Sequence, residues 1–303
     1  MAFSIGPVKM KNRLALAPMY RITDLPFRLL CREQGASLCY SELINSEALI
    51  RNNKSAQRLA QTSPKDRPLA MQVFGSRVES MKKAAELLSR EQNFDFLDLN
   101  LGCPSSNVIN QGAGSALLKR PKRVSEIISS WHDLGFVVTA KLRVSQNALQ
   151  SIKMAKLVEK AGASALAVHA RTVKQGNRGK ADFVALKRIK KSVGIPVIGN
   201  GGVKDRLSFD RVLEKTGCDA AMVGTASIGN PGVFAEILGK KPIAREKAFF
   251  KYLELCEEFK VEYFGRKKVQ AVRFFSHKRN AARALEKAEN LEQLFSIARK
   301  FSS

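Results

Sequence analysis

The sequence has few cysteines, and none is spaced as in small domains that are cross-linked by disulfide bonds. The five cysteines are odd in number, widely spaced and without a C-x-x-C pair. They are Cys31, Cys39, Cys103, Cys218 and Cys256. This pattern argues against disulfides and a structural metal site, and we predict no bound metal. A cysteine that matters in this chain should therefore matter as a thiol.

Long apolar runs are missing as well. No stretch reaches the roughly 18 uninterrupted apolar residues of a membrane span. The opening MAFSIGPVKMKN also lacks the basic-then-apolar order of a secretory signal. We therefore expect a cytoplasmic protein that does not associate with membranes.

Acidic residues are scarce relative to basic ones. The 303 residues include 52 Lys+Arg and 27 Asp+Glu, a net charge of +25. A basic surface can serve nucleic acid, an anionic membrane or solubility alone, and we favour nucleic acid. The remaining composition is ordinary, because 45% hydrophobic and 26% charged residues are typical of a folded chain and exclude a disordered one.

A repeating pattern is present, although no close sequence repeat is. Short apolar runs alternate with polar or glycine-containing breaks and amphipathic stretches, and each run is typical of a strand buried on both faces of a parallel sheet. Eight such units predict an α/β fold, a (β/α)8 TIM barrel; an open doubly wound sheet is the alternative. The runs are Leu14 to Ala17, Leu38 to Tyr40, Leu69 to Val73, Phe96 to Leu99, Val137 to Ala140, Leu166 to Val168, Val197 to Ile198 and Ala220 to Val223.

The pattern changes near Gly239, after which no strand is expected. We predict a catalytic barrel over residues 1–238 and an all-helical domain over residues 239–303. The helical domain is expected to contain three helical segments, around Ile243 to Phe264, Lys268 to Glu286 and Leu291 to Phe301.

The predicted helical domain is rich in basic residues, and Phe264, Phe274 and Phe275 lie among them. Basic side chains bind phosphates and aromatic rings stack on unpaired bases, so this domain is expected to contact RNA. For the phenylalanines we favour the alternative that they form the core of the helical bundle.

Polar or glycine residues follow the apolar runs, at the strand ends where barrels of this kind carry their reactive groups. Their presence after every run indicates that the barrel mouth binds a ligand. In chain order they are Pro18-Met19, Glu42, Gln72, Asn100 with Cys103, Lys141 with Arg143, His169 with Arg171, Asn200-Gly201-Gly202, and Gly224-Thr225.

The last two runs are followed by the glycine-rich segments GNGG and GTASIGNPG. Unobstructed backbone amides form anion sites, and the loops after the seventh and eighth strands are the usual phosphate site of such barrels. A glycine after a strand is often only a turn, but the paired position predicts a phosphorylated ligand or cofactor.

Three side chains at the mouth are candidates for chemistry. Lys141 and His169 end the fifth and sixth runs, where a cation and a hydrogen-bond donor can face an electron-rich ring. A lysine there is otherwise an exposed or paired charge, and a histidine a hydrogen-bonded core residue. Most lone cysteines are buried, whereas Cys103 lies in the polar loop NLGCPSSNVINQGAGSALL, which is expected to expose it.

These motifs resemble the dihydrouridine synthase family, flavoenzymes that reduce uridines in transfer RNA. The resemblance covers nearly the whole chain and keeps the order and spacing of the segments. They are LAPMYRITDLPFRLLCREQGA, LAMQVFG, LDLNLGCPSSNVINQGAGSALLKRP, AKLRVS, VHARTVKQGNRGKADF, VIGNGGV and MVGTASIGNPGVF.

The resemblance implies FMN in the mouth, NADPH as reductant and tRNA as substrate, with Cys103 as the catalytic residue. The implied FMN contacts are Pro18, Met19, Tyr20, Gln72, Lys141 and His169 at the ring, and Asn200, Gly201, Gly202, Gly224 and Thr225 at the phosphate. The implied contacts to the target uracil are Asn100 and Arg171. Arg143 at the end of the fifth run, and Lys278 and Arg279 in the basic run of the helical domain, are further residues expected to contact the RNA substrate.

The sequence departs from the family at two phosphate segments. Gly224-Thr225 stands where Gly-Arg is usual, and Asn200-Gly201-Gly202 where many members have Asn-Gly-Asp. One cation to the phosphate is therefore expected to be missing. The family's basic motif in the C-terminal helix is matched only loosely, by VRFFSHKRN.

We therefore predict a monomeric flavin-dependent oxidoreductase that reduces the C5–C6 double bond of specific uridines in tRNA with NADPH or NADH. A thiol is mostly protonated at neutral pH, which suits Cys103 to donate the proton. One alternative is an FMN barrel acting on a free pyrimidine, as dihydroorotate dehydrogenases do, but the charge and the helical tail argue against it. The other is an RNA-binding barrel without catalysis, which the joint presence of Cys103, Lys141 and His169 argues against.

Overall fold

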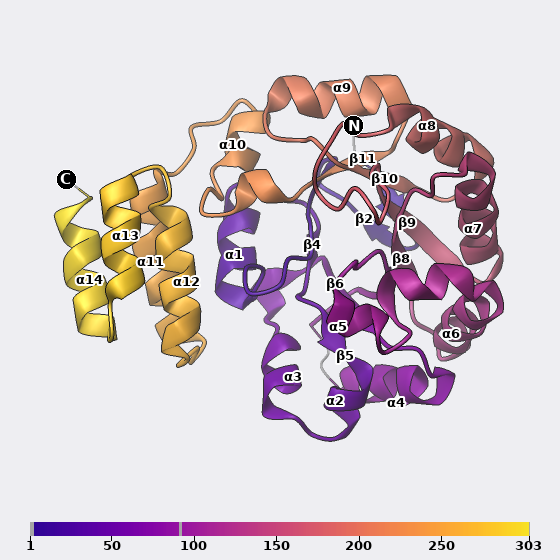
Figure 1. The fold of residues 1–303 in the computed structure, drawn as a ribbon, viewed down its shortest axis with the longest axis horizontal. Helices are drawn as coiled ribbons and strands as arrows, with labels where there is room; N and C mark the ends of the chain where they lie inside the picture. The colour runs from indigo at the N-terminus through magenta and orange to yellow at the C-terminus, as the bar shows by residue number, and fades with distance from the viewer. Residues whose placement is uncertain (1–2, 91–92, 303) are drawn as a thin grey trace.

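The computed structural model describes residues 3–90 and 93–302, and strands alternate with helices over most of this length (Figure 1). Runs of apolar residues buried on both faces form the strands, as the sequence predicts. The barrel strands are β3 (Leu14–Leu16), β4 (Cys39–Tyr40), β6 (Leu69–Phe74), β7 (Phe96–Leu101), β8 (Val138–Arg143), β9 (Ala163–His169), β10 (Val197–Asn200) and β11 (Ala220–Val223).

These eight strands form one parallel sheet that closes on itself. Their order is β4-β6-β7-β8-β9-β10-β11-β3, and a parallel bridge between Ala15 and Leu38 joins the two end strands. The predicted (β/α)8 TIM barrel is therefore confirmed, because an open doubly wound sheet would leave its end strands unjoined.

Three two-residue strands were not predicted, because they are too short for a periodic pattern. β5 (Ile44–Asn45) pairs with the end of β6. β1 (Ser4–Ile5) and β2 (Val8–Lys9) form an antiparallel hairpin, and Ile5 packs into the apolar cluster inside the barrel. The hairpin therefore plugs the end of the barrel opposite the strand carboxyl ends.

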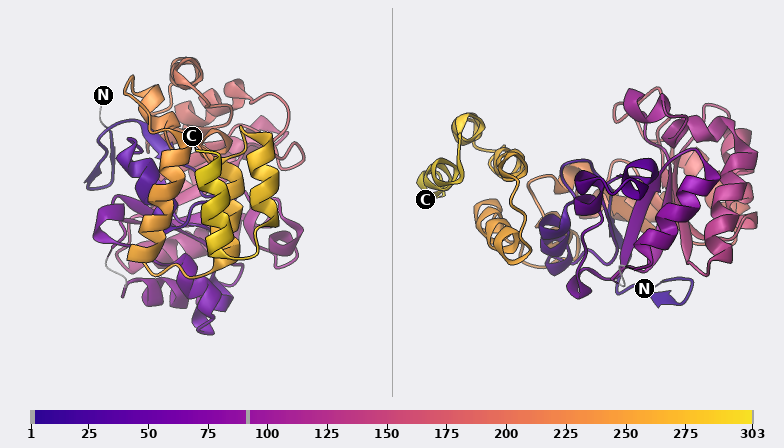
Figure 2. Two further views of the ribbon diagram at one scale, coloured as in Figure 1. Left: turned by 90° about the vertical axis from the view of Figure 1, so that its left-hand side faces the viewer. Right: turned by 90° about the horizontal axis from the view of Figure 1, so that it is seen from below.

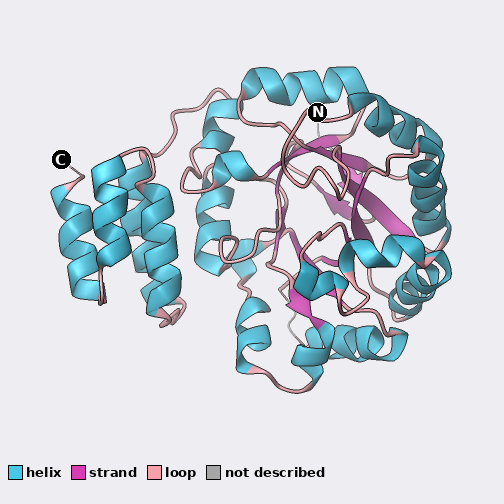
Figure 3. Cartoon of the chain, in the orientation of Figure 1, coloured by secondary structure: helices cyan, strands magenta, loops and turns pink. Residues whose placement is uncertain are grey.

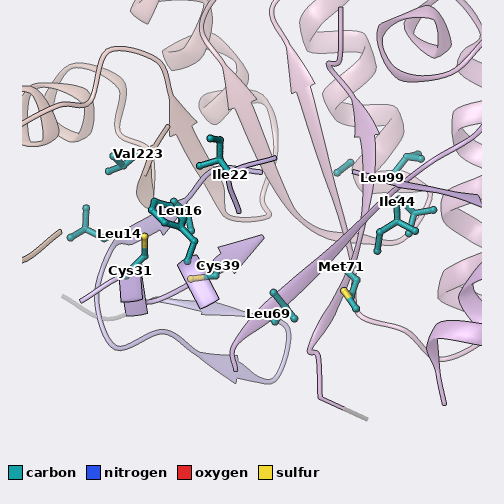
Figure 4. Close-up of a cluster of buried hydrophobic side chains, with 14 of the residues drawn as sticks. Leu14, Leu16, Ile22, Cys31, Cys39, Ile44, Leu69, Met71, Leu99 and Val223 are labelled. Atoms are coloured by element: carbon teal, nitrogen blue, oxygen red, sulfur yellow. The ribbon is translucent and has the colours of Figure 1, made fainter. Parts of the chain in front are cut away.

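Helices surround the strands on the outside (Figure 3). The apolar layer between them includes Leu14 and Leu16 of β3 and Cys31 of the first helix, which lie close together in Figure 4. The helices are α1 (Leu25–Glu33), α2 (Ser46–Ile50), α3 (Lys54–Leu59), α4 (Val78–Leu88), α5 (Ser106–Ile109), α6 (Pro121–Asp133), α7 (Ala148–Lys160), α8 (Phe183–Ser192), α9 (Arg206–Thr216) and α10 (Val233–Ile237), with 3-10 turns η1 (Pro64–Asp66), η2 (Gly114–Lys119) and η3 (Thr225–Ser227).

The inside of the barrel has an apolar half and a polar half. Alternate strand residues point inward, and toward the strand amino ends they are apolar, as at Ala70, Phe96 and Ala165. Toward the carboxyl ends they are polar or charged and still buried or half-buried, as at Gln72 and Lys141. The polar half is the place where sequence analysis expects the site.

The last four helices form a group of their own, to one side of the barrel (Figure 2). They are α11 (Arg245–Glu258), α12 (Phe264–Phe274), α13 (Arg279–Lys287) and α14 (Leu291–Lys300), and we call them the helical unit. None of the helices in the described part of the chain combines the length and apolar composition needed to cross a bilayer.

The prediction of three helical segments in this unit is wrong, because the second segment consists of two helices. The chain turns after α12, where the Lys278 amide donates to the Phe275 carbonyl. The turn lets Phe274 and Phe275 both pack against Phe249 of α11, with ring centroids 5.9 and 5.6 Å away. Both rings are fully buried and Phe264 is half-buried, which confirms that the phenylalanines belong to the core of the bundle.

A buried polar junction holds the helical unit to the loop that follows β3. Asp24 caps α1 and also accepts a hydrogen bond of 2.8 Å from the Tyr252 hydroxyl of α11. Arg266 of α12 lies 3.6 Å from Asp24 and forms an ion pair with Glu42. The second oxygen of Glu42 accepts the backbone N–H of Arg21, at 2.5 Å. One arginine of the helical unit therefore meets two buried carboxylates of the barrel.

Candidate active site

The strand register brings the predicted mouth residues together. Asn100 on β7 is paired with Lys141 on β8. Arg143 is paired with His169 on β9, and His169 with Asn200 on β10. Because paired residues of parallel strands point to the same face, these five side chains line one end of the barrel interior.

Cys103 lies in the loop after β7, half-buried, while the other four cysteines are buried. Its backbone N–H donates to Oδ1 of Asn100 at 2.9 Å, and its carbonyl accepts from Ser115 at 3.2 Å. Gly114 packs against it with a positive φ of 59°, and a Cβ there would lie 3.0 Å from the Cys103 carbonyl oxygen. Only glycine allows this close approach without strain.

Lys141 projects into the polar half of the barrel with few partners. Its Nζ donates to Oδ1 of Asn200 at 3.4 Å, the one hydrogen bond of this ammonium group among the described residues. Burial and, to a smaller extent, the charge of Arg143 lower the pKa of Lys141 to about 8, against an opposing contribution from Asp98. A buried ammonium group with free donors suits a ligand rich in acceptors or negative charge.

His169 is held neutral. Burial lowers its pKa to about 2, with added contributions from the charges of Lys141, Arg143 and Arg171. Nη1 of Arg171 lies 3.3 Å from Nε2 of His169, and a guanidinium group can only donate. Nε2 is therefore the acceptor, and the ring proton resides on Nδ1.

Arg143 connects two loops at the mouth. Its Nε donates to the Gly102 carbonyl at 2.8 Å, beside Cys103. Its Nη1 donates to the Gly176 carbonyl at 2.5 Å and its Nη2 to Asn177 at 3.2 Å. These bonds hold the cysteine loop against the loop after β9, a role that sequence analysis did not foresee, and RNA contact by Arg143 stays a prediction.

Asp98, which lies inside the polar half on β7, is a further site residue that was not predicted. The signal was available, since an aspartate at an inward position interrupts the apolar run FLDLNL. Burial raises the pKa of Asp98 to about 6, against hydrogen bonds from Thr139 and Gln72 and the charge of Lys141. Its carboxylate is fully buried.

The two glycine-rich loops present open backbone at the mouth. Gly202 has a positive φ of 84° and no atom within 4 Å of a built Cβ, and Nη1 of Arg171 lies 3.6 Å from such a Cβ on Gly201. Gly224 precedes η3, which no side chain caps, and Thr225 is exposed. This donor set, with Lys141 between the loops and Cys103, fits a phosphorylated cofactor with an electron-rich ring.

Within residues 3–90 and 93–302, no three His, Cys, Asp or Glu side chains gather closely enough to hold a metal ion.

A model of the family described as dihydrouridine synthase matches residues 15–301. The chain belongs to the dihydrouridine synthase family. The probable tRNA-dihydrouridine synthase of Aquifex aeolicus is 34% identical over 300 residues, 94% of each chain. The tRNA-dihydrouridine synthase B of Vibrio vulnificus is 36% identical over 275 residues, which cover 86% of this chain and 85% of that relative.

A third relative and a solved structure are also similar to this chain. The tRNA-dihydrouridine synthase B of Pseudomonas aeruginosa is 37% identical over 236 residues, 77% of this chain and 71% of the relative. The crystal structure of the BexX/CysO complex from Amycolatopsis orientalis has 17% sequence identity and a TM-score of 0.53, and covers 86% of this chain and 96% of that chain. At that identity the likeness concerns the fold alone.

Three of the predicted site residues, Tyr20, Lys278 and Arg279, do not point into the barrel interior. Tyr20 is 66% exposed, with the guanidinium of Arg21 5.5 Å from its ring centroid. Lys278 of the helical unit donates to the Phe301 carbonyl at 2.6 Å and pairs with Glu246 at 3.1 Å, whereas Arg279 is exposed. Their roles toward FMN or RNA stay predictions.

Proposed function

We propose that this dihydrouridine synthase family member uses FMN and NADPH to reduce the C5–C6 double bond of uridines in tRNA. The observation that carries the proposal is the strand register, which gathers Asn100, Lys141, Arg143, His169 and Asn200 around the loop of Cys103. The family and the tRNA-dihydrouridine synthases among its relatives support the substrate and the reaction.

The residues proposed for FMN form two groups. The backbone of Gly201, Gly202, Gly224 and Thr225 would bind the phosphate, with Asn200 beside them. Lys141 would stabilise negative charge at the N1 and O2 edge of the ring, neutral His169 would donate a hydrogen bond through Nδ1, and Gln72 would face another edge. Pro18 and Met19 would lie beside the ring, together with the backbone of Tyr20.

The proposed chemistry divides hydride and proton between two sources. When bound and reduced by NADPH, FMN supplies a hydride for C6 of the uracil. The electron pair of the C5–C6 double bond moves toward O4, and the Cys103 thiol donates its proton to C5. The resulting thiolate regains a proton from solvent, so one hydride and one proton are added and the cysteine is restored.

The remaining residues are proposed to position RNA. Asn100 and Arg171 would lie near the target uracil, which must leave the RNA stack at a cost of a few kcal/mol. Basic residues of the helical unit, Arg279 among them, would bind phosphates. We further propose a domain boundary between residues 238 and 239 and a monomeric enzyme. Because its proposed substrate is tRNA, we also propose that the enzyme is cytoplasmic.

Two measurements test the proposal. The purified protein should show the absorbance of oxidised flavin and bleach with NADPH, and tRNA from a deletion strain should gain dihydrouridine when incubated with the protein. Reduction of orotate instead of tRNA would favour an enzyme acting on a free pyrimidine. A protein that neither contains nor binds FMN would overturn the flavin proposal.

A further inference from the structure

Asp98 has no part in the function proposed above, yet it lies at the centre of a hydrogen-bonded chain. The strand register pairs it with Gln72 on β6 and Thr139 on β8. Its Oδ2 accepts from Nε2 of Gln72 and its Oδ1 from Oγ1 of Thr139, both at 2.6 Å. The carboxylate therefore makes short bonds to both neighbouring strands.

The series of hydrogen bonds continues from Gln72 to the loop of Cys103. Oε1 of Gln72 accepts from Nδ2 of Asn100 at 2.8 Å. Oδ1 of Asn100 then accepts two backbone N–H groups, that of Gly102 at 3.2 Å and that of Cys103 at 2.9 Å. Gln72 and Asn100 are both buried, so water does not compete freely for these bonds.

The donors and acceptors in this series of hydrogen bonds are fixed by the groups at its two ends. An ionised carboxylate only accepts hydrogen bonds, so Asp98 requires the amino end of the Gln72 amide. The backbone N–H groups only donate, so the loop requires the oxygen of the Asn100 amide. The two amides between them satisfy both requirements in one orientation, and a flipped amide would leave a buried donor facing a donor or an acceptor facing an acceptor.

We propose that Asp98 is a positioning residue, which orients the amides of Gln72 and Asn100 and thereby fixes the backbone of Cys103. Its importance for uridine reduction rests on the proposed function, but the hydrogen-bonded chain itself does not. The same orientation decides which polar atoms of Gln72 remain free to face the cofactor: one N–H and one lone pair of Oε1.

Three variants separate positioning from charge and from simple loss of packing. Asp98→Ala removes the acceptor. Asp98→Asn keeps an oxygen for Gln72, because its amino group can instead donate to the Thr139 hydroxyl, and removes only the charge. Thr139→Val deletes the other hydrogen bond to Asp98 and leaves the chain to Cys103 intact.

The first measurement is hydrogen exchange at the backbone amides of Gly102 and Cys103. We expect Asp98→Ala to accelerate this exchange at least roughly 10-fold over Thr139→Val, and Asp98→Asn to restore most of the protection. Equal exchange in Asp98→Ala and Thr139→Val would overturn the proposal. So would an Asp98→Asn protein that exchanges as fast as Asp98→Ala, because charge would then be the cause.

The second measurement is single-turnover reduction of tRNA by reduced enzyme. Asp98→Ala should slow it by roughly 10- to 100-fold, as loss of a group that supports a reacting residue usually does, without changing the apparent affinity for tRNA. If Asp98→Ala does not fold, Gln72→Leu interrupts the same chain and should produce the same exchange at Gly102 and Cys103. An enzyme in which even the wild type reduces no uridine contradicts the proposed function, while the exchange comparison still decides the role of Asp98.

Discussion

The interior of the barrel and the outer surface of the helical unit use charge in opposite ways. In the barrel, Asp98 and Lys141 are enclosed. Burial raises the pKa of Asp98 and lowers the pKa of Lys141, so in both cases it favours the neutral form. In the helical unit the core is aromatic, built on Phe249, Phe274 and Phe275, and arginines such as Arg279 lie outside. Burying a charge reduces stability unless the charge is paired and hydrogen-bonded, so the enclosed charges mark the barrel as the region organised for chemistry. The exposed arginines are the basis for the proposal that the helical unit binds a polyanion.

The largest effect is expected from Cys103. Cys103→Ala should slow uridine reduction by roughly 100- to 10,000-fold, the usual contribution of a positioned acid, and leave FMN and tRNA affinity nearly unchanged. Single-turnover oxidation of reduced enzyme by tRNA measures the rate. Cys218→Ala is the matched control, since Cys218 is buried away from the mouth residues. A wild-type rate in Cys103→Ala would mean that another group donates the proton.

The junction between the two regions should matter for stability. Arg266→Met leaves Glu42 and Asp24 buried without their cation, which usually costs roughly 3–5 kcal/mol. Urea unfolding of the FMN-free protein measures the loss. The double variant Arg266→Met with Glu42→Gln should recover part of it. Equal stability of the wild type and Arg266→Met would mean that the helical unit is held by its apolar contacts alone.

The surface of the helical unit should govern RNA affinity. Reversing the charge of the exposed Arg273, Arg279 and Arg283 should weaken tRNA binding by roughly 10- to 100-fold and reduce the slope of log affinity against log salt by roughly 2 to 3. Reduction of FMN by NADPH takes place in the barrel and should not change.

Filter binding of tRNA across a salt series makes this measurement. The matched control reverses Lys187, Arg188 and Lys191, which are exposed on α8, across the barrel from the helical unit in Figure 1. Equal losses in the two triple variants would indicate that net charge, and not the helical unit, determines affinity.

The smallest effect is a pH dependence in the barrel. Because the pKa of Lys141 in the FMN-free protein is lowered to about 8, its charge is present at pH 7 and lost as pH rises to 9. FMN affinity should therefore fall several-fold over this range, and Lys141→Met should flatten the profile. The stability of the FMN-free protein should change in the opposite direction to FMN affinity. Because the pKa of Lys141 lies below its unfolded value of 10.5, the free energy of unfolding increases as pH rises from 8 to 10.5.

Fluorescence titration of FMN at pH 7, 8 and 9 measures the affinity profile. Lys187→Met, on the exposed face of α8, is the control and should keep the wild-type profile. A profile that is identical in the wild type and Lys141→Met would place the titrating group elsewhere.

The fold and the position of the mouth could be predicted from the sequence, because buried parallel strands leave an apolar run followed by a polar break. Lys141 and His169 were found in this way. Asp98 was not, since a run that contains an aspartate still reads as a buried strand. Arg143 was assigned to RNA, because a sequence does not reveal that its three donors meet carbonyl and amide oxygens of two loops.

The sequence by itself determined the eight-stranded barrel, the helical tail, the basic charge and the family, since each depends on composition, period or motifs that are local in the chain. Only the tertiary structure decided which polar residues form hydrogen bonds and ion pairs with one another. The chain from Asp98 through Gln72 and Asn100 to Cys103, and the junction of Arg266 with Glu42 and Asp24, join residues on different strands and helices. Their partners depend on strand register and helix packing, which bring distant residues within hydrogen-bond reach.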